Sequence, residues 1–271
     1  MTTDTPTFTF PDGRTVNRLG YGAMRLTGQP GNFGPYADWQ GGVALLRRAR
    51  ELGIEHIDTA RAYGPHDNER LVGEALRGPD GTFGGMFVAS KGGVEKDAGG
   101  ITRDTRPQTM ARHVEESLWA LGVETIDLYY VHAPDGTTPL ADSVRALEEA
   151  RRAGRIARIG LSNVTRAQIE EAMAVAPISA VQNRYSPADE PDPEEEALID
   201  WLAERGIAYV AHGPLGAHPM RRGAAMDPAE ALRALLARAP NILVIPGTTS
   251  LEHLDANAAA LPSPAPSDRR P

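Results

Sequence analysis

The 271-residue chain contains no cysteine. This absence excludes a disulfide scaffold, a cysteine-ligated zinc site and a thiol nucleophile. Long apolar runs are also missing, because no stretch approaches the roughly 20 residues that a membrane-spanning helix needs. The first ten residues, MTTDTPTFTF, lack the charged and apolar regions of a signal peptide. We therefore expect a globular, cytoplasmic protein that has no membrane partner.

An excess of positive charge is the third feature that the chain lacks. Lys and Arg number 28 against 36 Asp and Glu, which gives a formal net charge of -8. Proteins that bind nucleic acids usually carry a basic face. We therefore expect a small molecule, and not a nucleic acid, as the partner.

Short apolar runs alternate with helical patterns along the chain. The runs typical of strands are residues 19–24, 54–58, 86–90, 126–131, 156–161, 178–181, 207–211 and 242–245. Helical patterns follow them at 38–52, 68–76, 107–121, 140–153, 166–175, 193–205, 228–239 and 251–260. Nearly continuous apolar strands are buried on both faces of a parallel sheet. Eight such units predict an α/β fold of the (β/α)8 TIM-barrel type, with a doubly wound open sheet as the competing architecture.

The two ends of the chain differ from this repeating pattern. Residues 8–17 alternate around Pro11-Asp12-Gly13, which predicts a β-hairpin. No linker divides the remainder, so residues 1–260 are expected to form one domain. The Pro-rich and charged segment 261–271 is expected to be a disordered tail.

Polar side chains follow most of the predicted strands, where a barrel carries its chemistry. Asp58, Tyr63, Lys91 and His132 follow the second, third and fourth strands. A lysine at a buried strand end needs a partner, and Asp58 is the obvious one. Lys91 beside a phenol is expected to lower the pKa of Tyr63 from about 10. With His132 orienting a carbonyl, these groups suit a carbonyl that receives a hydride, although a purely structural ion pair is the alternative interpretation.

Candidates for a cofactor site follow the other strands. Gly20-Tyr21-Gly22 is not a Rossmann fingerprint, because Arg25 stands at its sixth position and no helix follows. The turn 247–250 opens the last helix and is either a phosphate cradle or an ordinary N-cap. Ser162, Asn163 and Gln182 either bind a carboxamide or satisfy loop backbone.

A set of ordered motifs resembles the aldo-keto reductase family over residues 19–260. The motifs are GIEHIDTARAYG from Gly53, SK from Ser90, IDLYYVH from Ile126, IGLSN from Ile159, VQNRY from Val181, PLG from Pro214 and IPGT from Ile245. The resemblance implies a barrel whose bottom is closed by the N-terminal hairpin. It also implies a carbonyl reductase that uses NADPH, with NADH as the alternative cofactor.

The resemblance assigns a role to each of these residues. Tyr63 would be the general acid, Asp58 and Lys91 would tune it, and His132 would orient the carbonyl. The residues implied to bind the cofactor are Gly22, Ala23, Met24, Asp58, Ser162, Asn163, Gln182, His212, Gly213, Leu215, Gly216, Gly247, Thr248, Thr249, Ser250, His253 and Asn257. No metal is implied.

Three departures from the family pattern bear on the ligands. His212 stands where an aromatic ring usually stacks on the nicotinamide. The turn 248–250 and His253 lack the basic residues that often bind the 2′-phosphate, which weakens the preference for NADPH. The segment 217–239 is shorter than the corresponding segment usually is in the family. This predicts a shallow and open substrate pocket. Its walls are expected to come from loops 27–39, 96–106 and 217–227. Phe33, Tyr36 and Trp39 are expected either to form an apolar rim or to pack under the loop.

Two other functions compete with reduction. One is a non-catalytic, nicotinamide-binding regulatory subunit, since the same fold serves in channel-associated subunits. The other is a metal-dependent barrel hydrolase, with His56 and Asp58 on one strand face and His132 as a third ligand. Against the hydrolase, Lys91 would put a cation beside the metal.

Overall fold

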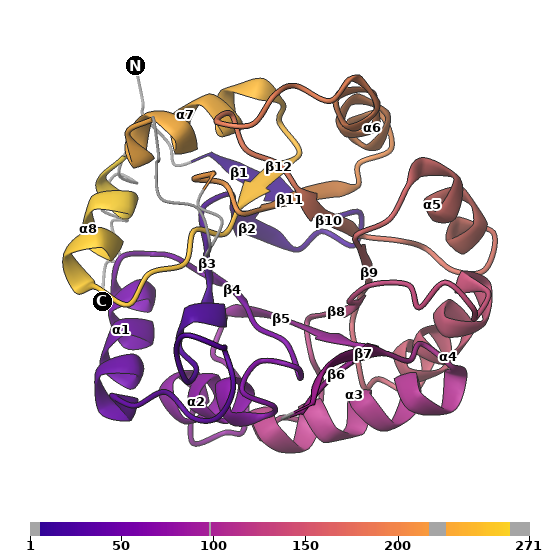
Figure 1. The fold of residues 1–271 in the computed structure, drawn as a ribbon, viewed down its shortest axis with the longest axis horizontal. Helices are drawn as coiled ribbons and strands as arrows, with labels where there is room; N and C mark the ends of the chain where they lie inside the picture. The colour runs from indigo at the N-terminus through magenta and orange to yellow at the C-terminus, as the bar shows by residue number, and fades with distance from the viewer. Residues whose placement is uncertain (1–5, 98, 217–225, 261–271) are drawn as a thin grey trace.

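Eight parallel strands form a barrel in the computed structural model, which describes residues 6–97, 99–216 and 226–260. The strands are β3 (Gly20–Gly22), β4 (His56–Asp58), β5 (Phe87–Gly92), β8 (Leu128–Val131), β9 (Ile159–Ser162), β10 (Ala180–Arg184), β11 (Ala208–His212) and β12 (Ile242–Val244). They are hydrogen-bonded in chain order, and a parallel bridge between Leu19 and Val244 joins the last strand to the first (Figure 1). The predicted barrel is confirmed, and the open sheet is excluded by this closure.

Helices surround the barrel and agree with the predicted pattern to within a few residues. They are α1 (Trp39–Glu51), α2 (Asp67–Leu76), α3 (Pro107–Leu121), α4 (Leu140–Arg152), α5 (Arg166–Met173), α6 (Pro193–Ala203), α7 (Pro228–Arg238) and α8 (Leu251–Ala259), with a 3₁₀ turn, η1 (Ala23–Arg25), after β3. Local chemistry sets several of their ends. The side chains of Asp38, Thr165 and Ser250 accept hydrogen bonds from the first turns of α1, α5 and α8. None of the helices among these residues is long and apolar enough to span a membrane.

The N-terminal hairpin packs against the lower end of the barrel interior. Its strands are β1 (Thr7–Thr9) and β2 (Thr15–Asn17). Phe8, Phe10 and Val16 share one apolar cluster with Phe87 and Leu128 of the barrel. The ring of Phe10 stacks on that of Phe87 at a centroid distance of 5.2 Å. The hairpin therefore covers the end of the barrel opposite the strand ends that carry the candidate site.

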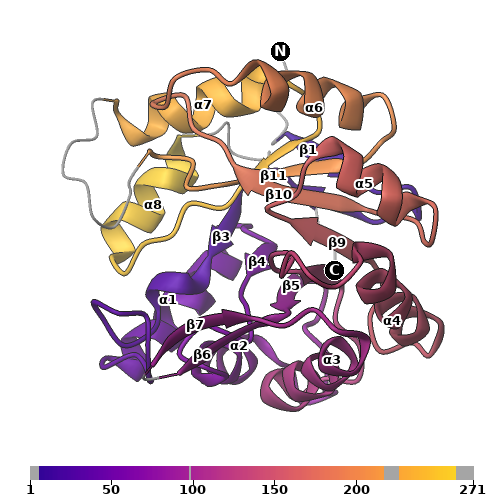
Figure 2. The same ribbon diagram turned by 45° about the vertical axis from the view of Figure 1, so that its right-hand side comes forward.

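A second hairpin lies between β5 and α3 and was not predicted. Its strands are β6 (Val94–Asp97) and β7 (Gly100–Arg103), paired antiparallel. The sequence interpretation treated most of this segment as a loop, because Val-Glu-Lys-Asp carries only one apolar residue and gives no strand signal. In Figures 1 and 2 the hairpin lies on the opposite side of the barrel from α7 and α8.

Two expectations fall outside the residues that the structure describes. The predicted tail, 261–271, is one of them. Residues 217–225, which make up much of the segment expected to be short and to wall the pocket, are the other.

Candidate active site

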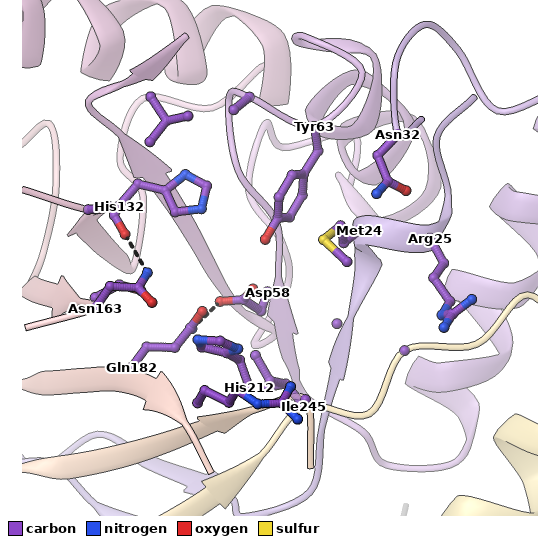
Figure 3. A pocket seen from close by; sticks show the side chains of 18 of the residues that line it. Met24, Arg25, Asn32, Asp58, Tyr63, His132, Asn163, Gln182, His212 and Ile245 are labelled. Atoms are coloured by element: carbon purple, nitrogen blue, oxygen red, sulfur yellow. Dashed lines mark hydrogen bonds between the residues drawn. The ribbon is translucent and has the colours of Figure 1, made fainter. Parts of the chain in front are cut away.

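The strand ends bring Asp58, Tyr63 and His132 to one cavity of about 540 Å³. Asp58 is the last residue of β4, and Tyr63 stands in the loop between β4 and α2. His132 directly follows β8. In Figure 3 the phenol of Tyr63 and the ring of His132 point into the same space. The cavity is therefore at the carboxyl end of the barrel, as the sequence predicted.

Lys91 lies within β5, buried behind these residues. Its ammonium forms an ion pair with Asp58 and donates a hydrogen bond to the carbonyl of Thr59 at 2.9 Å. Burial is the largest single influence and would lower the pKa of Lys91, but Asp58 and Tyr63 together outweigh it, so the pKa is raised. Lys91 therefore keeps its charge 5.2 Å from the centre of the Tyr63 ring.

The expected depression of the Tyr63 pKa is wrong in direction. Tyr63 opens only partly to the cavity, and desolvation by the surrounding protein raises its pKa. Lys91 opposes this shift through its charge and a hydrogen bond, without reversing it. The sequence interpretation considered the cation and left out the burial that comes with it. Tyr63 therefore stays protonated at neutral pH.

His132 is held in its neutral form. Desolvation lowers its pKa well below the ordinary value, and Lys91, His212 and Arg103 add to this effect. Its ring lies 5.9 Å from the Tyr63 ring, nearly perpendicular to it. Nδ1 is buried and has no hydrogen-bond partner among the described residues. A neutral imidazole in this position is able to donate a hydrogen bond to a carbonyl oxygen beside the phenol.

The three amide and hydroxyl candidates at the ends of β9 and β10 line the same cavity. Gln182 donates a hydrogen bond to the second oxygen of Asp58 at 2.7 Å. Asn163 donates to the His132 carbonyl and to Ser162 Oγ, both at 3.0 Å. Figure 3 shows the first two of these contacts. These side chains therefore support Asp58 and His132, while the Gln182 carbonyl oxygen stays available to a ligand.

The remaining cofactor candidates divide into two groups. Those that line the cavity are Gly22, Met24, His212, Gly213, Leu215 and Gly247. Those that do not are Ala23, Gly216, Thr248, Thr249, Ser250, His253 and Asn257. In the turn, Thr248 accepts from the Ser250 amide at 3.0 Å, and Ser250 accepts from the His253 amide at 3.3 Å. Ser250 is therefore the N-cap of α8, which was one of the two interpretations of this turn, and the Thr248 bond lies within the turn.

Two glycines leave the backbone of the cavity wall bare where β3 meets the segment after β12. A Cβ on Gly22 would lie 2.7 Å from the Ile245 carbonyl oxygen. A Cβ on Gly247 would lie 2.7 Å from the Gly22 carbonyl oxygen. Neither position accepts a side chain, because β3 and the segment after β12 pack backbone against backbone here.

The predicted loops 27–39 and 96–106 do contribute to the cavity wall, through Asn32, Lys96, Ile101 and Arg103. Sequence reasoning missed about a third of the cavity lining. The residues not anticipated are Arg25, Ala62, Val94, Ala133, Arg184, Pro214, Ile245 and Pro246. Arg25 and Arg184 adjoin predicted site residues along the chain, which was a usable signal. The predicted aromatic rim is wrong. Trp39 hydrogen-bonds Glu74 at 2.8 Å, Tyr36 packs on the core, and neither they nor Phe33 line the cavity.

The hydrolase interpretation needed metal ligands at these strand ends. Within the part of the chain that the structure describes, no group of three or more His, Cys, Asp or Glu could hold a metal ion. The His56 ring instead lies edge-on to Phe87, and Asp58 is paired with Lys91.

A closed barrel with a tyrosine, a neutral histidine and a buried Lys–Asp pair at one end has the groups of a carbonyl oxidoreductase. A model of the aldo/keto reductase family matches residues 18–233. The chain therefore belongs to the aldo/keto reductase family, a family of enzymes, as its motifs indicated.

Individual relatives agree with this assignment. The chain is 40% identical to pyridoxine 4-dehydrogenase of Escherichia coli K12 over 265 residues, which cover 91% of this chain and 90% of the relative. An aldo-keto reductase of Klebsiella pneumoniae in complex with NADPH is 27% identical with a TM-score of 0.74, and the match covers 96% of this chain and 90% of that one. A thermostable aldo-keto reductase bound to the inhibitor epalrestat is 28% identical with a TM-score of 0.76, over 94% and 93% of the two chains.

Proposed function

We propose that this protein reduces an aldehyde or ketone to an alcohol with NADPH, and that Tyr63 is the general acid. The observation that carries the proposal is the neutral phenol of Tyr63 beside Lys91 and His132 at one cavity. A protonated Tyr63 donates its proton to the carbonyl oxygen as the carbon is reduced. Lys91 stabilises the phenolate that remains, and Asp58 keeps Lys91 charged and in place.

His132 and Gln182 have different tasks in this scheme. The neutral His132 donates a hydrogen bond to the substrate oxygen, which fixes the carbonyl within reach of Tyr63. Gln182 uses its amide N–H on Asp58, and its carbonyl oxygen can accept from a carboxamide. The alternative of a regulatory subunit gives no reason for a complete proton-donating set facing the cavity.

NADPH is the proposed cofactor, and it supplies the hydride when bound. The main chain at Gly22 and Gly247 lines the cavity where it would bind. The amides of Asn163 and Gln182 suit its carboxamide. The Klebsiella pneumoniae relative was solved with NADPH. NADH is the competing cofactor, because the turn 248–250 and His253 lack the basic residues that often bind the 2′-phosphate.

The test compares the wild type with Tyr63→Phe on 4-nitrobenzaldehyde and on pyridoxal, the latter suggested by the Escherichia coli relative. Loss of the proton donor should lower kcat by ~10²-fold or more, while NADPH binding in a fluorescence titration is retained. Tyr36→Phe, which lies outside the cavity, is the matched control and should keep its activity.

Two outcomes would contradict the proposal. Equal turnover by Tyr63→Phe would exclude the tyrosine as general acid. Tight NADPH binding with no turnover of any carbonyl compound would favour the regulatory subunit. Repeating the titration with NADH decides the cofactor, since equal affinities would contradict the assignment of NADPH.

A further inference from the structure

The β6–β7 hairpin presents one face to the cavity. Strand side chains alternate between two faces, and directly paired residues of antiparallel strands share a face. Val94 pairs with Arg103, and Lys96 pairs with Ile101. All four of these residues line the cavity.

The other face of the hairpin is tied to the barrel by Glu95. Its carboxylate accepts hydrogen bonds from Arg61 at 2.8 Å and from Arg112 and His113 at 2.9 Å. The Arg61 side chain is itself almost fully buried. These contacts anchor one strand of the hairpin and hold its opposite face toward Tyr63 and His132.

The two cations on the cavity face are not equivalent. Lys96 donates hydrogen bonds to the carbonyls of Gly31 and Asn32, so it links the hairpin to the loop after η1. The guanidinium of Arg103 has no hydrogen bond or ion pair with any residue that the structure describes, although its main chain pairs with Val94. The adjacent acid, Asp104, is already paired with Arg106.

Arg103 also lies close enough to the reacting groups to affect them. Its charge is one of those that lower the pKa of His132. The cofactor candidate His212 is on β11, and Figure 1 shows β11 on the other side of the barrel from the hairpin. Arg103 therefore places a positive charge on the hairpin side of the cavity.

The charge of the cavity lining is opposite in sign to that of the whole chain. Four basic residues belong to this wall, Arg25, Lys96, Arg103 and Arg184, and Asp58 is the only acidic one among the described lining residues. Lys91 is buried behind it. Arg184 is paired with Asp189 at 2.9 Å, and Arg25 follows Met24 among the cofactor candidates. Arg103 is left as the cation that best suits an anionic group on the substrate.

We propose that Arg103 selects carbonyl substrates that carry a carboxylate or phosphate, bound on the hairpin side of the cavity. The guanidinium suits both groups, since it forms paired hydrogen bonds to planar or tetrahedral oxyanions. Val94 and Ile101 would contact the apolar part of the same substrate. This inference rests on the proposed reduction, because it names the class of substrate for that site.

The experiment compares 4-carboxybenzaldehyde with its neutral counterpart, methyl 4-formylbenzoate, using NADPH at neutral pH. Arg103→Gln should lower kcat/KM for the acid by about tenfold, mainly through KM, and change that for the ester by less than about twofold. Arg103→Glu should lower kcat/KM for the acid further than Arg103→Gln does. Arg103→Lys should recover part of the loss. Arg145→Gln, an exposed change of equal charge on α4, should alter neither substrate.

A second pair of substrates separates the two anions. Pyridoxal 5′-phosphate and pyridoxal are compared in the same variants, so a phosphate preference appears here and a carboxylate preference in the benzaldehyde pair. The inference would be overturned if, in both pairs, the ratio of kcat/KM for the charged substrate to that for the neutral one were the same in the Arg103 variants as in the wild type. Equal losses on charged and neutral substrates would overturn it too, since they would indicate a structural role of the hairpin.

A binding measurement separates this inference from the proposed reduction. Calorimetry with 4-(hydroxymethyl)benzoate should give about tenfold weaker binding to Arg103→Gln than to the wild type. Such binding without turnover of any aldehyde would contradict the reduction and support the anion site. Turnover of the neutral aldehydes, with binding that does not depend on Arg103, would keep the reduction and overturn the anion site.

Discussion

Glu69, in α2 just behind the site, is a carboxyl group that the proposed chemistry does not use. It is fully buried, one oxygen accepts from Ser90 Oγ at 2.5 Å, and the other has no partner among the described residues. Burial is the main cause that raises the pKa of Glu69 to about 7, against an ordinary value of 4.5. The folded protein therefore holds a proton here that the unfolded chain releases.

This residue makes the stability of the protein depend on pH. Because its folded pKa is raised, the stabilising contribution is complete below about pH 4.5 and is lost as the pH rises through about 7. Glu69→Gln does not titrate, so its stability relative to the wild type should increase between pH 5 and pH 8, by up to about 3 kcal/mol. Urea unfolding at both pH values measures this, with exposed Glu149→Gln as the control. A pH-independent difference would contradict the buried proton.

At the scale of elements, the contact between α2 and α3 depends on a glycine within a helix. Gly73 is buried in α2, and a Cβ there would lie 2.5 Å from the Leu121 carbonyl oxygen at the end of α3. An alanine normally stabilises a helix interior by up to about 1 kcal/mol relative to glycine. Here the methyl group meets backbone, which cannot rotate away, so packing outweighs helix propensity.

We therefore expect Gly73→Ala to destabilise the fold by about 1–3 kcal/mol. Arg70→Ala, an exposed change in the same helix, should stay within about 0.5 kcal/mol. Thermal unfolding followed by circular dichroism compares the two variants. A stabilised Gly73→Ala would mean that α2 moves away from α3 without cost.

At the scale of the whole molecule, closure of the barrel depends on Arg18. Its buried guanidinium donates to the carbonyls of Ile242 and Leu236 at 2.8 Å and to that of Ala239 at 2.5 Å. Burial lowers its pKa to about 10, so it stays charged at neutral pH. These acceptors belong to the end of α7 and the start of β12, next to the bridge that closes the barrel.

Removing this cation should weaken the closure. Arg18→Met leaves three carbonyls without their donor and should lower the free energy of unfolding by about 3 kcal/mol. Arg18→Lys should cost less because it keeps the charge, and exposed Arg145→Met serves as the control for general charge loss. Equilibrium unfolding in urea gives the values. A cost below about 0.5 kcal/mol would mean that water replaces the guanidinium.

Much of this molecule follows from local pattern alone. The strand and helix order was predictable because buried parallel strands are continuously apolar and their helices are amphipathic. Asp58, Lys91 and His132 were predictable as one group because parallel strands end at one rim of a barrel. The order of elements depends only on residues that are close together in the chain, and the grouping of these three follows once that order is known.

The tertiary structure decided what depends on burial and on contacts between distant segments. Desolvation of Tyr63 reversed the expected direction of its pKa shift, and this burial cannot be read from neighbouring residues. The segment 96–106 was predicted to wall the pocket, but its pairing as the β6–β7 hairpin was not. The hairpin owes its position to Glu95 bonding to Arg61 and Arg112, and these contacts decide which of its faces lines the cavity. The residue types at the strand ends could therefore be predicted from the sequence. The proton on the phenol and the charge facing the substrate were determined only by folding, because solvent exclusion and long-range pairing exist only in the folded chain.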